Sequence, residues 1–430
     1  MPRAVSGSTP MADVDAANLA LESGQPNVIT LAGLLAPGGF VDSRGEPDVA
    51  ALRDALAPRI RSVPALNRAP ENVDGAWSWR EVAPDLSHHI RLIPPDSAFE
   101  ETCARVIVQP LASGRPLWEM LLVPHAEDDR CGLLFRLHHA VADGMGAEEL
   151  IAAIADPMRT AGPGAVTAGP PHQAAPPRRR PLVHRAADIA AQTLAVFRRS
   201  VDSRVLLGPL GPTRDVAFVD VDLQRLHDGA RLLGGTVGDA FLAAFGRGLG
   251  ALLIAAGEEP PVTVPVSCPV RITRQQGEGN ATGVMLIPVP VAPVGSEDDI
   301  SGRVARVAAV TRSEKVRARA AGTFHPMRSP RAARLLMRFA QRQRAVGAIA
   351  SELTGPSRTL RLAGSELVAA WPLALLSGNV RVGALGVSYA GRFRVSIQTE
   401  ADHLPTARVV AESMATALDR IAAAPQESER

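Results

Sequence analysis

The chain has 430 residues, of which 46% are hydrophobic and 21% are charged. This balance is typical of a globular protein, excludes a disordered chain, and gives enough length for two domains. A net charge of only +2 provides no positive field that would favour nucleic acid as a partner. The three cysteines, Cys103, Cys131 and Cys268, are widely spaced and odd in number, which argues against a disulfide framework and a zinc site.

The sequence gives no sign of export or of a membrane span. The N-terminus lacks the basic start and apolar core of a signal peptide, and no run reaches the roughly 18 uncharged apolar residues that a span needs. The best candidate, residues 241–256, is interrupted by Arg247 and rich in glycine, so we expect a buried helix there. Together with the cysteine usage, this predicts a cytoplasmic protein.

The first 156 residues predict alternating strands and helices. Residues 28–35 and 117–123 are apolar runs typical of strands. Residues 47–60 and 99–111 carry apolar side chains at helical spacing. We therefore expect a mixed α/β layer domain over residues 1–156.

Residues 157–214 differ in kind from what precedes them. Many prolines and glycines, little apolar bulk and the arginine run at 178–180 indicate a linker up to residue 181. The arginines are either solvated or in contact with anionic lipid headgroups. Residues 183–205 regain helical periodicity, so a crossover helix is expected before residue 215.

The mixed pattern returns in residues 215–430, which we interpret as a second domain. Strands are predicted at 216–223, 261–266, 284–291, 380–389 and 393–398, and helices at 237–256, 298–320, 331–353 and 406–421. In the helix at 331–353, Arg334, Arg338 and Arg342 recur every four residues beside apolar neighbours. Such a helix lies either on a membrane surface or against a core with its arginines solvated.

Two adjacent histidines, His138 and His139, follow a short apolar run and precede Asp143 and Gly144. The run at 131–137 predicts a buried strand, and Asp-Gly predicts a turn before a helix. An imidazole at a strand end can face a cleft, and neutral histidine is a common general base near pH 7. A histidine at a strand end is more often structural. Because neighbouring strand residues point to opposite faces, at most one of the two is expected to do chemistry.

Further segments occur in the same order as in one known family. They are Arg-Pro-Leu-Trp-Glu at 115–119, His-His-x-x-x-Asp-Gly at 138–144, Val-Pro-Val-Ser at 264–267, Gly-Asn at 279–280 and Ser-Tyr-Ala-Gly at 388–391. With them the chain resembles the bacterial wax ester synthase/acyl-CoA:diacylglycerol acyltransferase family, within the CoA-dependent acyltransferases and condensation domains. The resemblance implies an α/β fold of two chloramphenicol-acetyltransferase-like domains that form a pseudo-dimer with a channel between them.

The resemblance also implies roles for the residues of the histidine motif. His139 is expected to take the proton of the attacking hydroxyl and to return it to the leaving thiolate, without an acyl-enzyme. His138 is expected to pack or hydrogen-bond. Asp143 is expected to anchor the turn, with Arg271 of the second half as its candidate partner. Gly144 permits close approach to substrate, and its amide or that of Asp143 is a candidate donor to the oxyanion.

Three other residues are candidates for supporting roles. Glu119 either orients a partner or has a structural role beside a buried Trp118, and the structural role is the more common one. Asn280 lies either at the cleft or in a turn. None of the three carries a decisive signal in the sequence alone.

Three positions depart from the family's pattern. Gly238 stands where asparagine is usual, Glu352 interrupts a usual Ser-Asn-Val-Pro-Gly-Pro, and Ala390 replaces an acidic residue. The histidine motif is intact, so the departures bear on the choice of acceptor and on the level of activity.

These features predict an O-acyltransferase that moves a fatty acyl group from acyl-CoA to diacylglycerol or a long-chain alcohol. One alternative is an acyltransferase for a small-molecule metabolite with a CoA or carrier-protein donor. The other is a non-catalytic lipid-binding relative. Because no phosphate loop, metal-ligand cluster or Gly-x-Ser-x-Gly elbow occurs, we expect no cofactor, with acyl-CoA as a substrate. Contact with a membrane or lipid-droplet surface is a further expectation.

Overall fold

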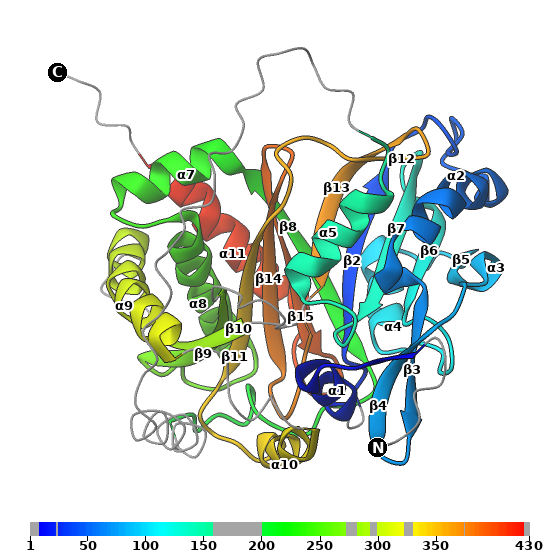
Figure 1. Ribbon diagram of the computed structural model, residues 1–430. Coiled ribbons are helices and arrows are strands. Elements are labelled where there is room, and N and C mark those ends of the chain that lie inside the picture. Colours follow the sequence, from blue (N-terminus) through cyan, green and yellow to red (C-terminus); the bar gives the residue numbers. More distant parts are fainter. Residues whose placement is uncertain are drawn as a thin grey trace.

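The computed structural model describes residues 8–22, 25–157, 200–271, 282–292, 299–321, 330–373 and 375–424. Two six-stranded sheets stand side by side, with helices packed around them (Figure 1). A small three-stranded sheet of order β1-β4-β3 accompanies the first of them. Its strands are β1 (Ser8–Pro10), β3 (Arg68–Val73) and β4 (Ala76–Glu81).

The first large sheet has the strand order β12-β13-β2-β7-β6-β5. Its strands are β12 (Arg361–Leu362), β13 (Ser365–Leu373), β2 (Val28–Leu35), β7 (Arg130–His138), β6 (Trp118–Glu127) and β5 (Ile90–Leu92). The helices of this half are α1 (Asp13–Ala20), α2 (Val49–Ser62), α3 (Leu86–His89), α4 (Phe99–Ile107) and α5 (Gly144–Ile154), with a 3-10 turn at Pro64–Leu66. Apolar clusters cover both faces of the sheet, so residues 131–138 of β7 are all buried. That is why this strand is apolar in sequence apart from Arg136 and His138.

The second large sheet has the strand order β10-β9-β11-β14-β15-β8. Its strands are β8 (Arg214–Asp222), β9 (Thr263–Arg271), β10 (Thr282–Pro290), β11 (Ala348–Thr354), β14 (Val382–Tyr389) and β15 (Arg392–Glu400). The helices are α7 (Leu223–Leu232), α8 (Val237–Ala255), α9 (Ile300–Ala321), α10 (Pro330–Ala340) and α11 (Ala407–Ala422). Helices α7, α8, α9 and α11 cover one side of this sheet, at the left of Figure 1.

Helix α8 is the core helix of the second half. It is the one helix in the described part of the chain that is long and apolar enough to cross a membrane, and 72% of that stretch is buried inside the protein. Its glycines let it lie close to β10: a methyl group on Gly246 would lie 2.3 Å from the carbonyl oxygen of Pro290. The buried helix predicted here is therefore confirmed.

A strand of the second half of the chain joins the first sheet, which the sequence analysis did not predict. Strand β13 comes from the second half of the chain but pairs with β2 in the first sheet, with Ala370 opposite Gly33. Trp371 of β13 then stacks on Phe218 of β8 with ring centroids 4.5 Å apart. The domain boundaries at residues 156 and 215 stay a prediction, and in space residues 361–373 belong to the first sheet.

Most predicted elements occur in the structure, but one prediction is wrong. The helix expected at 331–353 ends at Ala340 as α10, and residues 348–354 form strand β11 instead. Strand β11 is parallel to both β9 and β14, inside the sheet. Residues 348–354 mix apolar and polar side chains over only seven positions, which is too short for periodicity alone to distinguish a strand from the end of a helix. The linker and the start of the crossover helix lie outside the described residues.

The predicted hairpin between β14 and β15 is confirmed, and its turn includes one of the unusual positions. Ala390 (φ 48°) and Gly391 (φ 78°) both adopt left-handed conformations. A two-residue turn of this kind matches the twist of the flanking strands. An alanine pays a conformational cost in this region that glycine does not pay.

Candidate active site

A cavity of about 230 Å³ lies between elements of the two halves, and His139 is in its wall. The wall is built from α1 and the loop after it, the end of β7, α10 and the loop before β14. Its residues are Asn18, Leu21, Gln25, Pro26, Asn27, His139, Met337, Gln341, Leu375, Leu376, Ser377 and Gly378. The imidazole is therefore within reach of a small molecule and not enclosed by packed side chains.

The two histidines differ in burial. His138 is the last residue of β7 and is 2% exposed, whereas His139 keeps partial exposure. The backbone N–H of His139 donates to the carbonyl oxygen of Asn27 at 2.9 Å. This bond ties the start of the turn to the loop after α1, so the His139 ring is held at the cavity by its backbone.

The ring of His138 is fully engaged in the protein. The backbone N–H of Ala140 donates to its Nδ1 at 2.9 Å, so in the neutral ring Nε2 carries the hydrogen. Nε2 then donates to Oε1 of Glu22 at 3.1 Å, and this bond lowers the pKa of Glu22. A ring with both nitrogens occupied is a structural one, in line with the packing role expected for His138.

The surroundings of His139 keep its ring neutral. Burial lowers the pKa of His139 to about 4; His138 acts in the same direction, and the carboxylate of Asp143 acts against it. The residue keeps partial exposure in the cavity wall, but protein atoms replace most of the water around its ring. At pH 7 the imidazole is therefore uncharged, which is the form that can accept a proton.

Asp143 caps the helix that follows the motif. Its Oδ1 accepts the N–H of Gly146 at 2.8 Å, which makes it the N-cap of α5. This is a turn anchor of the predicted kind. Gly144 is the first residue of α5, so its N–H belongs to the positive end of the helix.

Two candidate residues of the second half cannot be judged from the described structure. Arg271 is the last residue of β9, and its side chain is outside the described part, so its pairing with Asp143 stays a prediction. Asn280 lies outside the described residues altogether.

Trp118 and Glu119 lie in the sheet and are not among the residues of the cavity wall. The Nε1 of Trp118 donates to the carbonyl oxygen of Leu66 at 2.9 Å, and its ring stacks on His89 at 4.5 Å. Glu119 accepts hydrogen bonds from Arg136 and, at 3.0 Å, from Arg91. The contacts of Trp118 and Glu119 are with other residues of the protein, which fits a structural role for both.

Sequence reasoning missed the asparagines that hold the cavity loop. Nδ2 of Asn27 donates to the backbone oxygen of Asn18 at 3.0 Å and to its Oδ1 at 3.2 Å. Both residues are buried and line the cavity. Two polar residues within 10 positions of each other beside an apolar helix face were the available signal, although nothing in the spacing connects them to His139.

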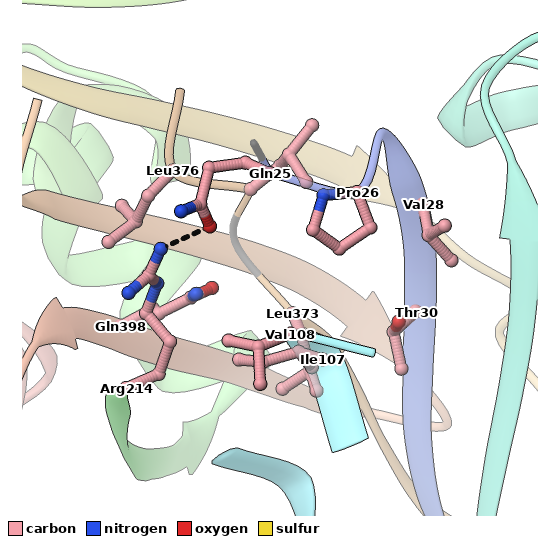
Figure 2. Close-up of a pocket in the computed structure, with 11 residues that line it drawn as sticks. Gln25, Pro26, Val28, Thr30, Ile107, Val108, Arg214, Leu373, Leu376 and Gln398 are labelled. Atoms are coloured by element: carbon pink, nitrogen blue, oxygen red, sulfur yellow. Dashed lines mark hydrogen bonds between the residues drawn. The ribbon is translucent and has the colours of Figure 1, made fainter. Parts of the chain in front are cut away.

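A smaller pocket of about 10 Å³ adjoins this loop and shares Gln25, Pro26, Leu375 and Leu376 with the larger cavity. Figure 2 shows that Gln25 accepts a hydrogen bond from Arg214 of β8. The loop after α1 is thus fixed to both halves. Its position in the cavity wall depends on the packing of one half against the other.

Other chemistry finds little support near the site. Burial raises the pKa of Cys131 to about 12, so this thiol on the strand leading to the histidines is a core residue and not a nucleophile. Within the described ranges, no group of three or more His, Cys, Asp or Glu side chains is arranged to hold a metal ion.

Comparison with known proteins identifies the family. Residues 11–201 match the wax ester synthase/diacylglycerol acyltransferase catalytic domain, and residues 278–422 match the C-terminal domain of the same family. The chain belongs to the wax ester synthase/diacylglycerol acyltransferase family. This confirms the resemblance found in the motifs, and the chain is an enzyme of the acyl-CoA-dependent O-acyltransferase type.

Relatives of this wax ester synthase/diacylglycerol acyltransferase family member span most of its length. The probable diacylglycerol O-acyltransferase tgs1 of Mycobacterium tuberculosis is 26% identical over 88% of this chain and 89% of its own. The wax ester synthase/diacylglycerol acyltransferase from Marinobacter aquaeolei has a TM-score of 0.69 at 19% identity, over 96% of this chain and 98% of that one. A starter condensation domain of rhizomide synthetase, solved with C8-CoA and Leu-SNAC, has a TM-score of 0.58 at 15% identity, over 97% and 94% of the two chains. The predicted fold of two chloramphenicol-acetyltransferase-like domains is thereby confirmed.

Two departures from the family pattern meet in space. A methyl group on Gly238, near the start of α8, would lie 2.3 Å from Oε2 of Glu352. The glutamate thus fills room that a side chain at 238 would need. Surrounding protein atoms raise the pKa of Glu352 to about 7 although the residue keeps solvent exposure, and Lys315, the only lysine of the chain, acts against this. The two departures therefore lie next to each other in the structure.

Proposed function

We propose that this protein transfers a fatty acyl group from acyl-CoA to the hydroxyl of diacylglycerol or of a long-chain alcohol. One observation carries the proposal: His139, neutral and partly exposed, lies in the wall of a cavity between the two halves. The family membership supports the reaction type. The condensation domain solved with C8-CoA supports a CoA thioester as donor, and the mycobacterial relatives named for diacylglycerol support a lipid acceptor.

In the proposed reaction, a ring nitrogen of His139 accepts the proton of the acceptor hydroxyl as its oxygen attacks the thioester carbon. The carbonyl oxygen gains the negative charge of the tetrahedral intermediate. As the intermediate collapses, the carbon–sulfur bond breaks and the imidazolium gives its proton to the departing thiolate, which leaves as free CoA. No acyl-enzyme is needed, because both substrates meet at one imidazole.

Two local charges support this chemistry. The low pKa of His139 makes its imidazolium costly to form, and the carboxylate of Asp143 offsets part of that cost. The N-terminus of α5, with Gly144 as its first residue, offers backbone N–H groups for the oxyanion.

The cavity wall supports an apolar acceptor. Leu21, Pro26, Met337, Leu375 and Leu376 are its apolar residues, and its other side chains are four uncharged amides, one hydroxyl and His139 itself. An alkyl chain next to the reacting hydroxyl fits such a wall, and a charged metabolite does not. We also propose that the protein works in the cytoplasm and meets its acceptor at a membrane or lipid-droplet surface; its three cysteines, all buried and unpaired, agree with a reducing compartment.

Release of free CoA tests the proposal. Purified protein is supplied with palmitoyl-CoA and, in turn, with diacylglycerol, hexadecanol or a polar small-molecule alcohol. We expect release with the two lipid acceptors, a loss of roughly a thousandfold in His139→Ala, and retained activity in the folded fraction of His138→Gln. Intact-mass measurement of the protein during turnover should detect no acylated chain.

The outcomes separate the alternatives. Release only with polar acceptors favours a metabolite acyltransferase, and binding of palmitoyl-CoA without any release favours a non-catalytic relative. Full activity in His139→Ala contradicts the proposed base.

A further inference from the structure

Helix α10 carries an unusual outer surface. Leu335 is 54% exposed and Phe339, one turn later, is 45% exposed. Arg331, Arg334 and Arg338 of the helix and Arg342 in the turn after it are also exposed, and residues 330–350 include no acidic residue. We refer to these two apolar and four basic residues as the α10 face.

The other side of the same helix belongs to the active-site cavity. Ala333 is fully buried, and Met337 and Gln341 line the cavity together with His139. Helix α10 also packs against α1, which supplies Asn18 to the same wall (Figure 1). One helix therefore stands between the cavity and the surroundings of the protein.

We propose that the α10 face docks on an anionic lipid surface and that the acceptor enters the His139 cavity from there, past Met337. This rests on the proposed function, because only an acceptor dissolved in lipid needs such a route. Leucine and phenylalanine one turn apart can enter the boundary between headgroups and acyl chains, while guanidinium groups remain at the phosphates. Each arginine near an anionic surface adds roughly a fivefold gain in partition.

The charge pattern favours lipid over a protein partner. A protein interface depletes charge at its centre and orders it in pairs, whereas the α10 face presents four like charges in a single band. Arg344, just beyond the face, already pairs with Asp202 at 2.5 Å and is not counted in it. Leu232 on α7 is exposed to a similar extent and also follows an arginine, but it is not among the residues of the cavity wall.

Vesicle co-sedimentation tests the docking. The full chain is mixed with vesicles of phosphatidylcholine alone or with 30 mol% phosphatidylglycerol, an amount of roughly physiological order. We expect binding to the anionic vesicles that weakens with salt, and a loss of about tenfold or more in Leu335→Ser/Phe339→Ser and in Arg334→Ser/Arg338→Ser. The matched control, Arg231→Ser/Leu232→Ser on α7, changes an arginine and a leucine that is 51% exposed, and should bind as the natural chain does.

A paired activity assay separates this inference from the proposed function. CoA release with a short, water-soluble alcohol should stay within about twofold in both α10 variants, while release with diacylglycerol in anionic vesicles should fall about tenfold. Unchanged vesicle binding in the α10 variants overturns the docking, as does a dimer of the natural chain that these substitutions dissolve. If the natural chain binds vesicles but releases no CoA with any acceptor, the proposed function fails and the docking stands.

Discussion

The polar side chains at the end of β7 have different surroundings: some are buried among protein partners, and one lines the cavity. On the side of α4, Arg136 is fully buried and bonded to Glu119, and the ring of His138 has a partner at each nitrogen. On the cavity side, His139 keeps partial exposure and a ring that burial holds neutral. Buried ion pairs and hydrogen bonds fix the position of a strand, and a residue that lines a cavity is the one that can meet a substrate.

The buried ion pair between Arg136 and Glu119 is costly to desolvate, so the stability of the fold is sensitive to the loss of either partner. Burial lowers the pKa of Arg136, and the carboxylate of Glu119 is the main influence against it. A buried ion pair contributes little net stability compared with an apolar pair, but removing one partner leaves a buried charge without its counter-charge. Removing one partner of the Arg136–Glu119 pair therefore gives the strongest test of the difference between the two sides of the strand.

We expect Glu119→Gln to lower the free energy of unfolding by about 3 kcal/mol, because it leaves the Arg136 guanidinium buried beside a neutral amide. Chemical denaturation followed by circular dichroism measures the loss. The matched control is Arg91→Gln: Arg91 also bonds to Glu119, but its side chain is 39% exposed, so its loss should cost less than about 1 kcal/mol.

Activity gives the second half of this test. If Glu119 has only a structural role, the folded fraction of Glu119→Gln retains its turnover number. A turnover number reduced a hundredfold in a fully folded variant would mean that the α4 side takes part in the chemistry, and the contrast between the two sides would fail.

Asp143 lies at the border between the two sides and gives a smaller effect. We expect Asp143→Ala to cost about 1 kcal/mol of stability, since it removes the cap of α5, and Asp143→Asn to cost only a few tenths, since asparagine caps equally well. Thermal unfolding of both variants measures this order. A large loss of activity in the well-folded Asp143→Asn would show that the charge itself is used, as in the predicted pair with Arg271.

The sequence predicted the local part of this arrangement and not the distant part. The apolar run before His138 and the turn at Asp143 follow from period and turn chemistry within 14 residues, and the structure contains them. The cavity around His139 depends on residues such as Met337 and Leu376, which are some 200 positions away. No local pattern encodes that approach.

Two features of the fold show the same limit. Strand β13 lies in the first sheet only because β2 offers it an edge, and nothing within residues 365–373 states which sheet they will join. The seven residues of strand β11 also fit the end of a helix in sequence, and their pairing with β9 and β14 makes them a strand. The family resemblance supplied the architecture that such non-local contacts decide.

The smallest expected effect concerns pH: kcat/KM should not change between pH 8 and pH 6. A histidine with the ordinary pKa of about 6.5 would retain only about a quarter of its neutral form at pH 6. Burial lowers the pKa of His139 to about 4, so the ring should remain almost entirely neutral from pH 8 down to pH 6. We therefore expect kcat/KM with a water-soluble alcohol to be unchanged within experimental error over this range, with the fold checked by circular dichroism at each pH. A fourfold fall centred near pH 6.5 in protein that stays folded would mean that the ring is as solvated as an ordinary surface histidine, and the cavity side would not be the desolvated site described above.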